Sequence, residues 1–289
     1  MIVRKTPAEI EKMRAAGRVV AEVLEALSKA IVPGVTRTVD LDVLALQICR
    51  QRGAIPAFNG YRGFPANTCL SVNEAVVHGI PDQRVLVEGD IISLDFACSL
   101  NGYFADAAVT VPVGEVSAEA KRLLRVTREA LYKGIAQARI GSRLGDVASA
   151  IQRHAESAGY GVVRDLVGHG IGRAMHEEPQ VPNFGRPRTG DRLAEGMTLA
   201  IEPMINQGVA GVEQLSDKWT IVTADGKLSA HFEHTVAITR RGPDILTLGS
   251  GGRGVGTGAP DATVAVEQEE TNLVGAGEDS VPAAPLRVG

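Results

Sequence analysis

Apolar residues near the start of the chain recur at intervals of three, four and seven, the spacing of a helix with one buried face. They stand at Ile10, Met13, Val20, Leu24 and Leu27. The preceding segment 6–9, Thr-Pro-Ala-Glu, is a capping box with proline at the first helical position, so it predicts where this helix begins. A Pro33-Gly34 break follows, and a shorter helix is expected around Leu41 to Arg50.

The second half of the chain repeats this arrangement. Helical spacing runs from about Ala118 to Ala138, breaks at 140–142 (Ile-Gly-Ser), and resumes from about Leu144 to Ser157. Strand-like segments follow each pair of helices. A unit of two helices and several strands that is used twice predicts a pseudo-symmetric α+β fold, with helices on one face of an antiparallel sheet.

The clearest local pattern is a β-hairpin centred on Asn101-Gly102. Strand-like residues flank this dipeptide over 90–111, and Asn-Gly between two strands is the strongest short-range signal for a two-residue turn. The register of such a hairpin pairs Leu100 with Tyr103, Asp95 with Ala108 and Ala97 with Asp106.

Asp95 and Asp106 are therefore expected to be diagonal neighbours on one polar face of the hairpin. Polar residues of the same face are Ser93, Ser99 and Thr110, whereas the apolar face carries Ile92, Leu94, Phe96, Cys98, Leu100, Val109 and Val111. Two neighbouring carboxylates repel, so either one is protonated or a cation lies between them. A solvated pair is the alternative, but a sheet with an apolar back tends to enclose its other face in a cleft.

Two further acidic residues and one histidine extend this pattern. Glu202 and Glu233 each stand on the polar side of an alternating strand pattern, over 197–202 and over 228–238 respectively. His169 lies among glycines in Gly168-His-Gly-Ile-Gly172, and glycines let the backbone approach a neighbour closely. Four carboxylates nearly balance two divalent cations and leave room for a bridging hydroxide. Oxygen donors with one imidazole suit Mn, Fe(II) or Co better than a structural zinc site of the thiolate type.

Composition indicates a soluble globular protein of 289 residues, with 22% charged residues and a net charge of −4. This charge gives no global attraction to nucleic acid or to anionic lipid. Three cysteines (Cys49, Cys69 and Cys98) without C-x-x-C spacing fit a reducing compartment. No signal-peptide core opens the sequence, and no run approaches the roughly 18 apolar residues of a membrane span. The expected location is the cytoplasm.

The composition of the chain changes near Ser250. Residues 251–289 are rich in Gly, Ala, Val and Glu and lack aromatic residues. Such a segment buries too little apolar surface to offset the entropy of ordering it. We therefore predict a catalytic domain over 1–250 and a low-complexity, disordered tail over 251–289.

Six motifs together resemble the type I methionine aminopeptidases over about residues 3 to 248. Besides the hairpin with two aspartates, they are Asn73-Glu-Ala-Val-Val-His-Gly-Ile-Pro81, Gly168-His-Gly-Ile-Gly172, His176-Glu-Glu-Pro179, Ile201-Glu-Pro-Met204 and Phe232-Glu-His-Thr235. The resemblance implies the pita-bread fold, which agrees with the predicted duplication. It also implies removal of the initiator methionine from nascent chains whose second residue is small. The expected partners are nascent N-termini at the ribosome, and the expected state is a monomer in the short bacterial form.

The resemblance assigns roles to particular residues. It implies that the metal ligands are Asp95, Asp106, His169, Glu202 and Glu233, with Asp106 and Glu233 bridging two divalent ions, which in such enzymes are Co, Mn, Fe(II), Zn or Ni. Glu202 is also expected to shuttle a proton, while His78 and His176 face the substrate. The residues expected to hold a Na or K ion are Asn73, Ala75 and Ser229.

The methionine side chain needs an apolar pocket. Its expected walls are Phe58, Tyr61, Phe64, Cys69, Met175 and Trp219. Two of these depart from the family pattern, because Met175 stands where an aromatic residue is frequent and Phe64 stands where Tyr is common. Packing of these aromatics in the core, without contact to a ligand, is the alternative.

Three other classes share parts of this pattern. Aminopeptidase P and prolidase relatives have the same five ligands, but they usually carry an additional N-terminal domain. Type II methionine aminopeptidases have an insertion of roughly sixty residues, whereas 30 residues separate Glu202 from Glu233 here. Non-catalytic pita-bread binding modules typically lack the ligands that this sequence retains.

Overall fold

The computed structural model describes residues 2–249, so the predicted tail over 251–289 lies outside the described residues. Its α-helices are α1 (Pro7–Ala30), α2 (Thr38–Gln51), α3 (Ala118–Gln137) and α4 (Leu144–Ser157). All four agree with the predicted helices. The capping box is present as well: Thr6 accepts a hydrogen bond from the backbone N–H of Glu9, and the Glu9 carboxylate accepts one from the backbone N–H of Thr6.

Strands and one 3₁₀ turn make up the rest of the described secondary structure. In the first half these are β1 (Ile55–Pro56), η1 (Tyr61–Gly63), β2 (Cys69–Val72), β3 (Ala75–Val77), β4 (Ile91–Leu100) and β5 (Tyr103–Pro112). In the second half they are β6 (Gly161–Val162), β7 (Gly168–Gly170), β8 (Glu177–Val181), β9 (Thr198–Ile201), β10 (Met204–Asn206), β11 (Val212–Gln214), β12 (Ile221–Thr223), β13 (Ser229–His231), β14 (Glu233–Thr239) and β15 (Gly242–Ile245).

The central sheet is antiparallel, and its strands follow the order β1-β4-β5-β14-β9-β7-β8, with β2 added to β4 and β15 added to β14. The predicted hairpin is confirmed as β4 and β5, with the predicted register from Leu100 opposite Tyr103 to Asp95 opposite Ala108. Its turn residues Asn101 and Gly102 have φ angles of 53° and 78°, the left-handed conformation that a two-residue hairpin turn of this kind requires.

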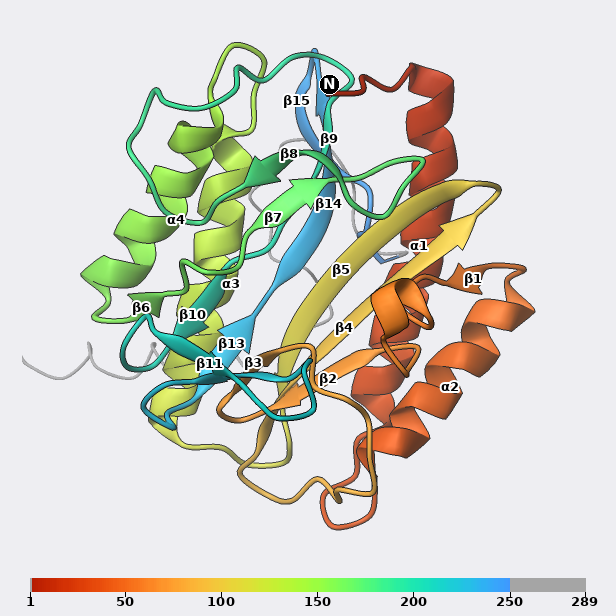
Figure 1. Ribbon diagram of the computed structural model, residues 1–289, viewed down its shortest axis with the longest axis vertical. Helices are drawn as coiled ribbons and strands as arrows, with labels where there is room; N and C mark the ends of the chain where they lie inside the picture. Colours follow the sequence, from red (N-terminus) through yellow and green to blue (C-terminus); the bar gives the residue numbers. More distant parts are fainter. Residues whose placement is uncertain (1, 250–289) are drawn as a thin grey trace, which may run out of the picture.

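The helices cover the two halves of the sheet in pairs (Figure 1). Helices α1 and α2 pack against β4 and β5, where Leu24, Leu41, Leu94 and Phe96 belong to one buried cluster. Helices α3 and α4 bury a second cluster against β9 and β14, with members such as Leu123, Ile151, Leu199 and Val236. This is the predicted pseudo-symmetric α+β arrangement.

Two extended segments that pair with each other, 198–206 and 229–239, are both interrupted where they face each other. The alternation over 228–238 suggested one strand, but the structure divides it at Phe232 into β13 and β14, which belong to different sheets. The facing segment divides in the same way at Pro203, which has no N–H to contribute to a strand ladder. The pairing runs from Ile201 opposite His234 to Met204 opposite His231. Glu202 lies in this shared interruption, and Glu233 borders it as the first residue of β14.

Two small three-stranded sheets, β13-β10-β6 and β11-β12-β3, lie beside the central sheet. In the part of the chain that the structure describes, no helix is long and apolar enough to cross a membrane.

Candidate metal centre and substrate pocket

The two aspartates lie in the middle of the central hairpin. Asp95 is 7% exposed and Asp106 is 4% exposed, so both carboxylates are enclosed by protein. The hairpin register places them diagonally on one face, as predicted. Thr235 of the neighbouring strand β14 binds the backbone of Asp106 through its hydroxyl group, which ties the hairpin to the second half of the sheet.

His169 is brought to this face by close packing of its backbone. An added Cβ atom at Gly168 would lie 2.3 Å from the carbonyl oxygen of Ala200, and one at Gly170 would lie 2.2 Å from that of Glu178. Only glycine allows β7 to approach its neighbours this closely. The His169 ring donates its Nδ1–H to the carbonyl oxygen of Gly170 at 2.8 Å, so Nε2 is left to face the carboxylates.

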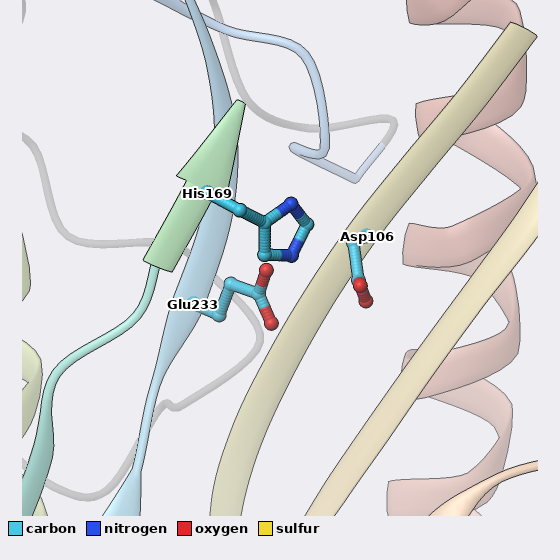
Figure 2. A group of neighbouring side chains, drawn as sticks. All are labelled: Asp106, His169 and Glu233. Carbon is cyan, nitrogen blue, oxygen red and sulfur yellow. The ribbon is translucent and has the colours of Figure 1, made fainter. Parts of the chain in front are cut away.

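The side chains converge from separate strands. Asp106, His169 and Glu233 point toward one another from β5, β7 and β14 (Figure 2), and one ligand atom of each lies within 4.8 Å of the others. Glu202 completes the group, with its Oε1 3.6 Å from Nε2 of His169. All five predicted metal ligands line one cavity.

The carboxylates of this cluster are buried and repel one another, so a nearby positive charge would stabilise their ionised forms. Burial raises the pKa of Asp106 to about 7. Burial and then repulsion from neighbouring carboxylates raise the pKa values of Asp95, Glu202 and Glu233 well above their usual range. Within the described chain, Asp95 Oδ1, Asp106 Oδ1 and Glu233 Oε1 are buried without a hydrogen-bond partner. Buried acceptor oxygens with one neutral imidazole are a donor set that fits divalent cations, so the residues fit the predicted metals.

Two more histidines stand at the edge of the cluster. The ring of His176 stacks on Tyr61 with centroids 5.2 Å apart, and its centroid is 4.1 Å from that of His169. Burial, then the nearby His169 and Arg62, lowers the pKa of His176 to about 3. His78 adopts a φ of 58°, and burial lowers its pKa as well. Both rings are therefore neutral hydrogen-bonding groups at neutral pH.

The predicted apolar walls surround the same cavity. They are Phe58, Tyr61, Phe64, Cys69, Met175 and Trp219. Phe64 meets Phe58 and Trp219 edge to face, with ring centroids 6.3 and 5.2 Å apart. These residues thus lie beside the carboxylates, and their contact with a methionine side chain stays a prediction.

Side chains outside the cavity hold these walls in place. Asp42 of α2 is 9% exposed and accepts hydrogen bonds from the backbone N–H groups of Asn67 and Thr68 and from both of their side chains. Lys5 forms a buried ion pair with Glu177, next to His176. Glu177 also accepts hydrogen bonds from the backbone N–H groups of Arg173 and Ala174, which fixes the loop that carries Met175 and His176.

Four residues of this neighbourhood were not predicted. Arg62 lines the cavity, His231 lies beside Glu202 and Glu233, and Asp42 and Lys5 brace the walls. The position of His231 on the polar side of its strand pattern was the available signal for that residue. Nothing in local sequence marks Asp42 or Lys5, because their partners are distant in the chain.

The residues predicted to hold a monovalent cation lie close together. The carbonyl oxygen of Asn73 accepts a hydrogen bond from the N–H of Ser229, and Ala75 pairs with Val222 in the adjoining small sheet. Asn73 is fixed further by its side chain, which bonds Asp90 and the backbone N–H of Ile91. A cation at this position stays a prediction.

Comparison with known proteins gives consistent matches. The model of metallopeptidase family M24 matches residues 11–240. A methionine aminopeptidase of Clostridium acetobutylicum is 56% identical over 249 residues, which covers 86% of this chain and 99% of that protein. The crystal structure of a methionine aminopeptidase from Thermotoga maritima superposes with a TM-score of 0.84 at 52% identity and covers 86% of this chain and 99% of that one.

A more distant structure shares the fold alone. The prolidase from Pyrococcus furiosus is 23% identical with a TM-score of 0.69, and the match covers 85% of this chain but 65% of the prolidase. The M24 match over most of the chain and the high identity along the whole length of the relative lead to one conclusion. This chain belongs to metallopeptidase family M24 and, within it, to the methionine aminopeptidases.

Proposed function

We propose that this chain is a metal-dependent aminopeptidase that removes the initiator methionine from new proteins when the second residue is small. One observation carries the proposal: a single cavity contains both a buried cluster of four carboxylates with one histidine and an apolar wall beside that cluster. Relatives about half identical in sequence are named methionine aminopeptidases, which supports the same activity.

We propose that Asp95, Asp106, His169, Glu202 and Glu233 hold two divalent cations, with Asp106 and Glu233 shared between them. Bound divalent cations supply a water of lowered pKa and polarise the scissile carbonyl. Mn, Fe(II) or Co suits this donor set, and Zn and Ni are further candidates. Na or K is the proposed occupant of the site at Asn73, Ala75 and Ser229.

The side chains around the cluster act on the substrate directly. Glu202 carries a raised pKa, so its carboxyl group is suited to take a proton and pass it to the leaving amine. His176 is neutral and donates an N–H to the scissile amide or to the developing oxyanion, and His78 contacts the backbone of the second residue. The thioether of the N-terminal methionine packs among the aromatic walls and Met175.

The cellular setting follows from this activity. We infer that the substrates are nascent chains at the ribosome, that the enzyme is cytoplasmic and that it acts as a monomer. Residues 1–250 are the proposed catalytic domain.

Peptide cleavage by metal-stripped protein that is re-supplied with Mn, Co or Fe(II) tests the proposal. Met-Ala-Ser should be cleaved only after metal is added, while Met-Lys-Ser and Ala-Pro should remain intact. Preferred cleavage of Ala-Pro would move the chain to the proline-specific branch of the fold. Folded protein without activity under any metal would indicate a binding module.

A further inference from the structure

His231 is a buried histidine next to the carboxylate cluster, and its ring is not satisfied. The residue is 2% exposed, and in the span 2–249 neither Nδ1 nor Nε2 has a hydrogen-bond partner. A buried polar ring without partners is unfavourable, because it loses its hydrogen bonds to water without replacing them. Core packing alone would favour an apolar side chain of similar size at this position.

The backbone of His231 is held firmly on both sides. Thr110 of β5 accepts a hydrogen bond from its N–H and donates one to its carbonyl oxygen, both at 2.8 Å. The Thr110 hydroxyl is itself 2.9 Å from that of Ser93. His231 also ends β13, where it pairs with Met204 directly beside the shared break of the strands. These bonds fix the backbone position from which the His231 ring extends toward the carboxylate cluster.

The ring nitrogen Nε2 faces two carboxylates at once. It lies 3.9 Å from Oε2 of Glu202 and 3.9 Å from Oε2 of Glu233. Both distances are slightly longer than a hydrogen bond, which spans roughly 2.7–3.2 Å between heavy atoms. A small rotation of either glutamate side chain brings one of these oxygens within range.

The two oxygens of Glu202 face different histidines. Oε1 lies 3.6 Å from Nε2 of His169, whereas Oε2 lies on the side of His231. If Glu202 binds a cation beside His169 through Oε1, then Oε2 is left as a buried acceptor that needs a donor. The N–H of His231 is placed to provide it.

We propose that His231 is a positioning residue that donates its Nε2–H to Oε2 of Glu202, beside Oε2 of Glu233, and so orients Glu202 as a metal ligand. This inference rests on the proposed function, because it takes these glutamates as ligands. Outer donors of this kind fix the direction of a ligand, and their loss typically weakens metal affinity or activity by about 10–100-fold.

Two substitutions of similar size separate donation from packing. His231→Met removes the donor, and His231→Gln retains an N–H on a side chain of comparable reach. For metal-stripped protein titrated with Mn(II) in a calorimeter, we expect His231→Met to raise the dissociation constant by about 10–100-fold. We expect His231→Gln to stay within about threefold of the unsubstituted protein, since its donor remains.

His234 offers a matched control, because it is close to His231 in sequence but its ring is held by other partners. His234 is also buried, and its ring bonds Thr247 at 2.9 Å and Tyr132 at 3.2 Å instead of facing the carboxylates. His234→Gln should leave Mn(II) affinity unchanged. The visible absorption spectrum of the Co(II)-loaded protein gives a second measure, and only His231→Met should alter it.

Several results would overturn the proposal. His231→Met that binds Mn(II) as tightly as the unsubstituted protein would do so, as would equal losses in the Met and Gln variants, which would indicate packing alone. If metal-stripped His231→Met does not fold, His231→Asn replaces it. The amide of Asn is one methylene shorter than that of Gln, so its N–H reaches less far toward the glutamates. Equal Mn(II) affinity in the Asn and Gln variants would then contradict the proposal.

Activity measurements keep this inference separate from the proposed function. For Met-Ala-Ser, His231→Met should lower kcat by about tenfold or more with little change in KM, because orientation of the ligands affects the chemical step. Absence of Met-Ala-Ser cleavage by the unsubstituted protein would instead contradict the proposed function itself.

Discussion

The carboxylate cluster and the proposed substrate pocket share one cavity, yet the fold holds them in different ways. Four of the five proposed ligands lie within strands β4, β5, β7 and β14, and Glu202 directly follows β9. Their backbones are fixed by ladder hydrogen bonds along the central sheet. The pocket walls come mostly from the segment 58–69, from the loop before β8 and from the turn before β12.

This difference predicts which residues control each part. In the cluster, many ladder hydrogen bonds together position the ligand backbones. Only a substitution of a ligand, or of a side chain that donates a hydrogen bond to a ligand, should therefore change metal binding and catalysis. In the pocket, a few distant side chains such as Asp42 and Lys5 hold whole loops. Substitution of these should change substrate binding without touching the metal ligands.

The largest effect is expected at Asp106, which faces both His169 and Glu233. Asp106→Asn removes a negative charge that the cluster uses to hold cations, so activity on Met-Ala-Ser should be abolished under any metal. A peptide-cleavage assay with Mn, Co and Fe(II) checks this. A nearly normal rate in the folded variant would contradict the assignment of Asp106 as a ligand.

A large effect on stability, with a smaller one on catalysis, is expected at Lys5. Its side chain is 2% exposed and that of its partner Glu177 is 11% exposed. Lys5→Met leaves a buried carboxylate unpaired, which should lower the free energy of unfolding by about 3–5 kcal/mol. Loosening of the loop that carries Met175 and His176 should also raise KM for Met-Ala-Ser.

Two further variants test the cause of that loss. Lys29→Met breaks an exposed pair with Glu25 and should change stability by less than about 1 kcal/mol. Adding Glu177→Gln to Lys5→Met should recover part of the stability, because the unpaired charge is gone. Equal melting temperatures for Lys5→Met and the unsubstituted protein would show that the buried pair does not brace the loop.

An intermediate effect is expected at Asp42. Its carboxylate accepts hydrogen bonds from Asn67 and Thr68, and in Asp42→Asn an N–H₂ group would face either the Asn67 amide or several N–H and O–H donors. The loss should be about 1.5–3 kcal/mol, with a raised KM and unchanged Mn(II) affinity. Denaturant unfolding and metal titration of the same sample measure both. A change in Mn(II) affinity would contradict the separation of the two regions.

The smallest predicted effect is a pH dependence of the metal-stripped protein. The folded pKa of Asp106, about 7, is above its unfolded value, so the stabilisation from its bound proton is lost as pH rises through 7. The buried histidines act in the opposite sense, because their lowered pKa values keep them neutral in the folded state while the unfolded chain protonates them near pH 6.5. Their contribution is nearly complete by about pH 7.5. Asp106 alone should lower the stability by about 1 kcal/mol between pH 6.5 and 8. Asp95, Glu202 and Glu233, whose pKa values are also raised, act in the same direction, so the net stability should fall over this range.

Thermal unfolding across this pH range checks the sign of that change. Added Mn(II) should stabilise the protein more at pH 8 than at pH 6.5, because the ligands bind metal in their deprotonated form. Stability that rises over this range without metal would contradict the picture of repelling carboxylates.

The contrast between the two regions also explains what the sequence could predict. The hairpin register followed from one Asn-Gly turn and placed Asp95 and Asp106 correctly, because turn length determines every pairing along both strands. The close approach of β7 followed from the glycines around His169. In both cases the information is local.

Other features depended on contacts between distant segments. The shared break of the strands at Pro203 and Phe232 arises where two segments face each other, so alternation within 228–238 alone did not reveal it. The bond from Asp42 to Asn67 and the pair of Lys5 with Glu177 join residues 25 and 172 positions apart. No periodicity within one segment indicates such partners.

The most direct test of the central claim is one titration of metal-stripped protein with Mn(II), in which bound metal and Met-Ala-Ser cleavage are measured in the same samples. We predict that activity is absent at the start and returns as the site fills, with up to two ions bound per chain and with neither binding nor activity restored in Asp106→Asn. Full activity of the metal-stripped protein, or equal Mn(II) binding by Asp106→Asn, would contradict the assignment of the buried carboxylates as the metal centre.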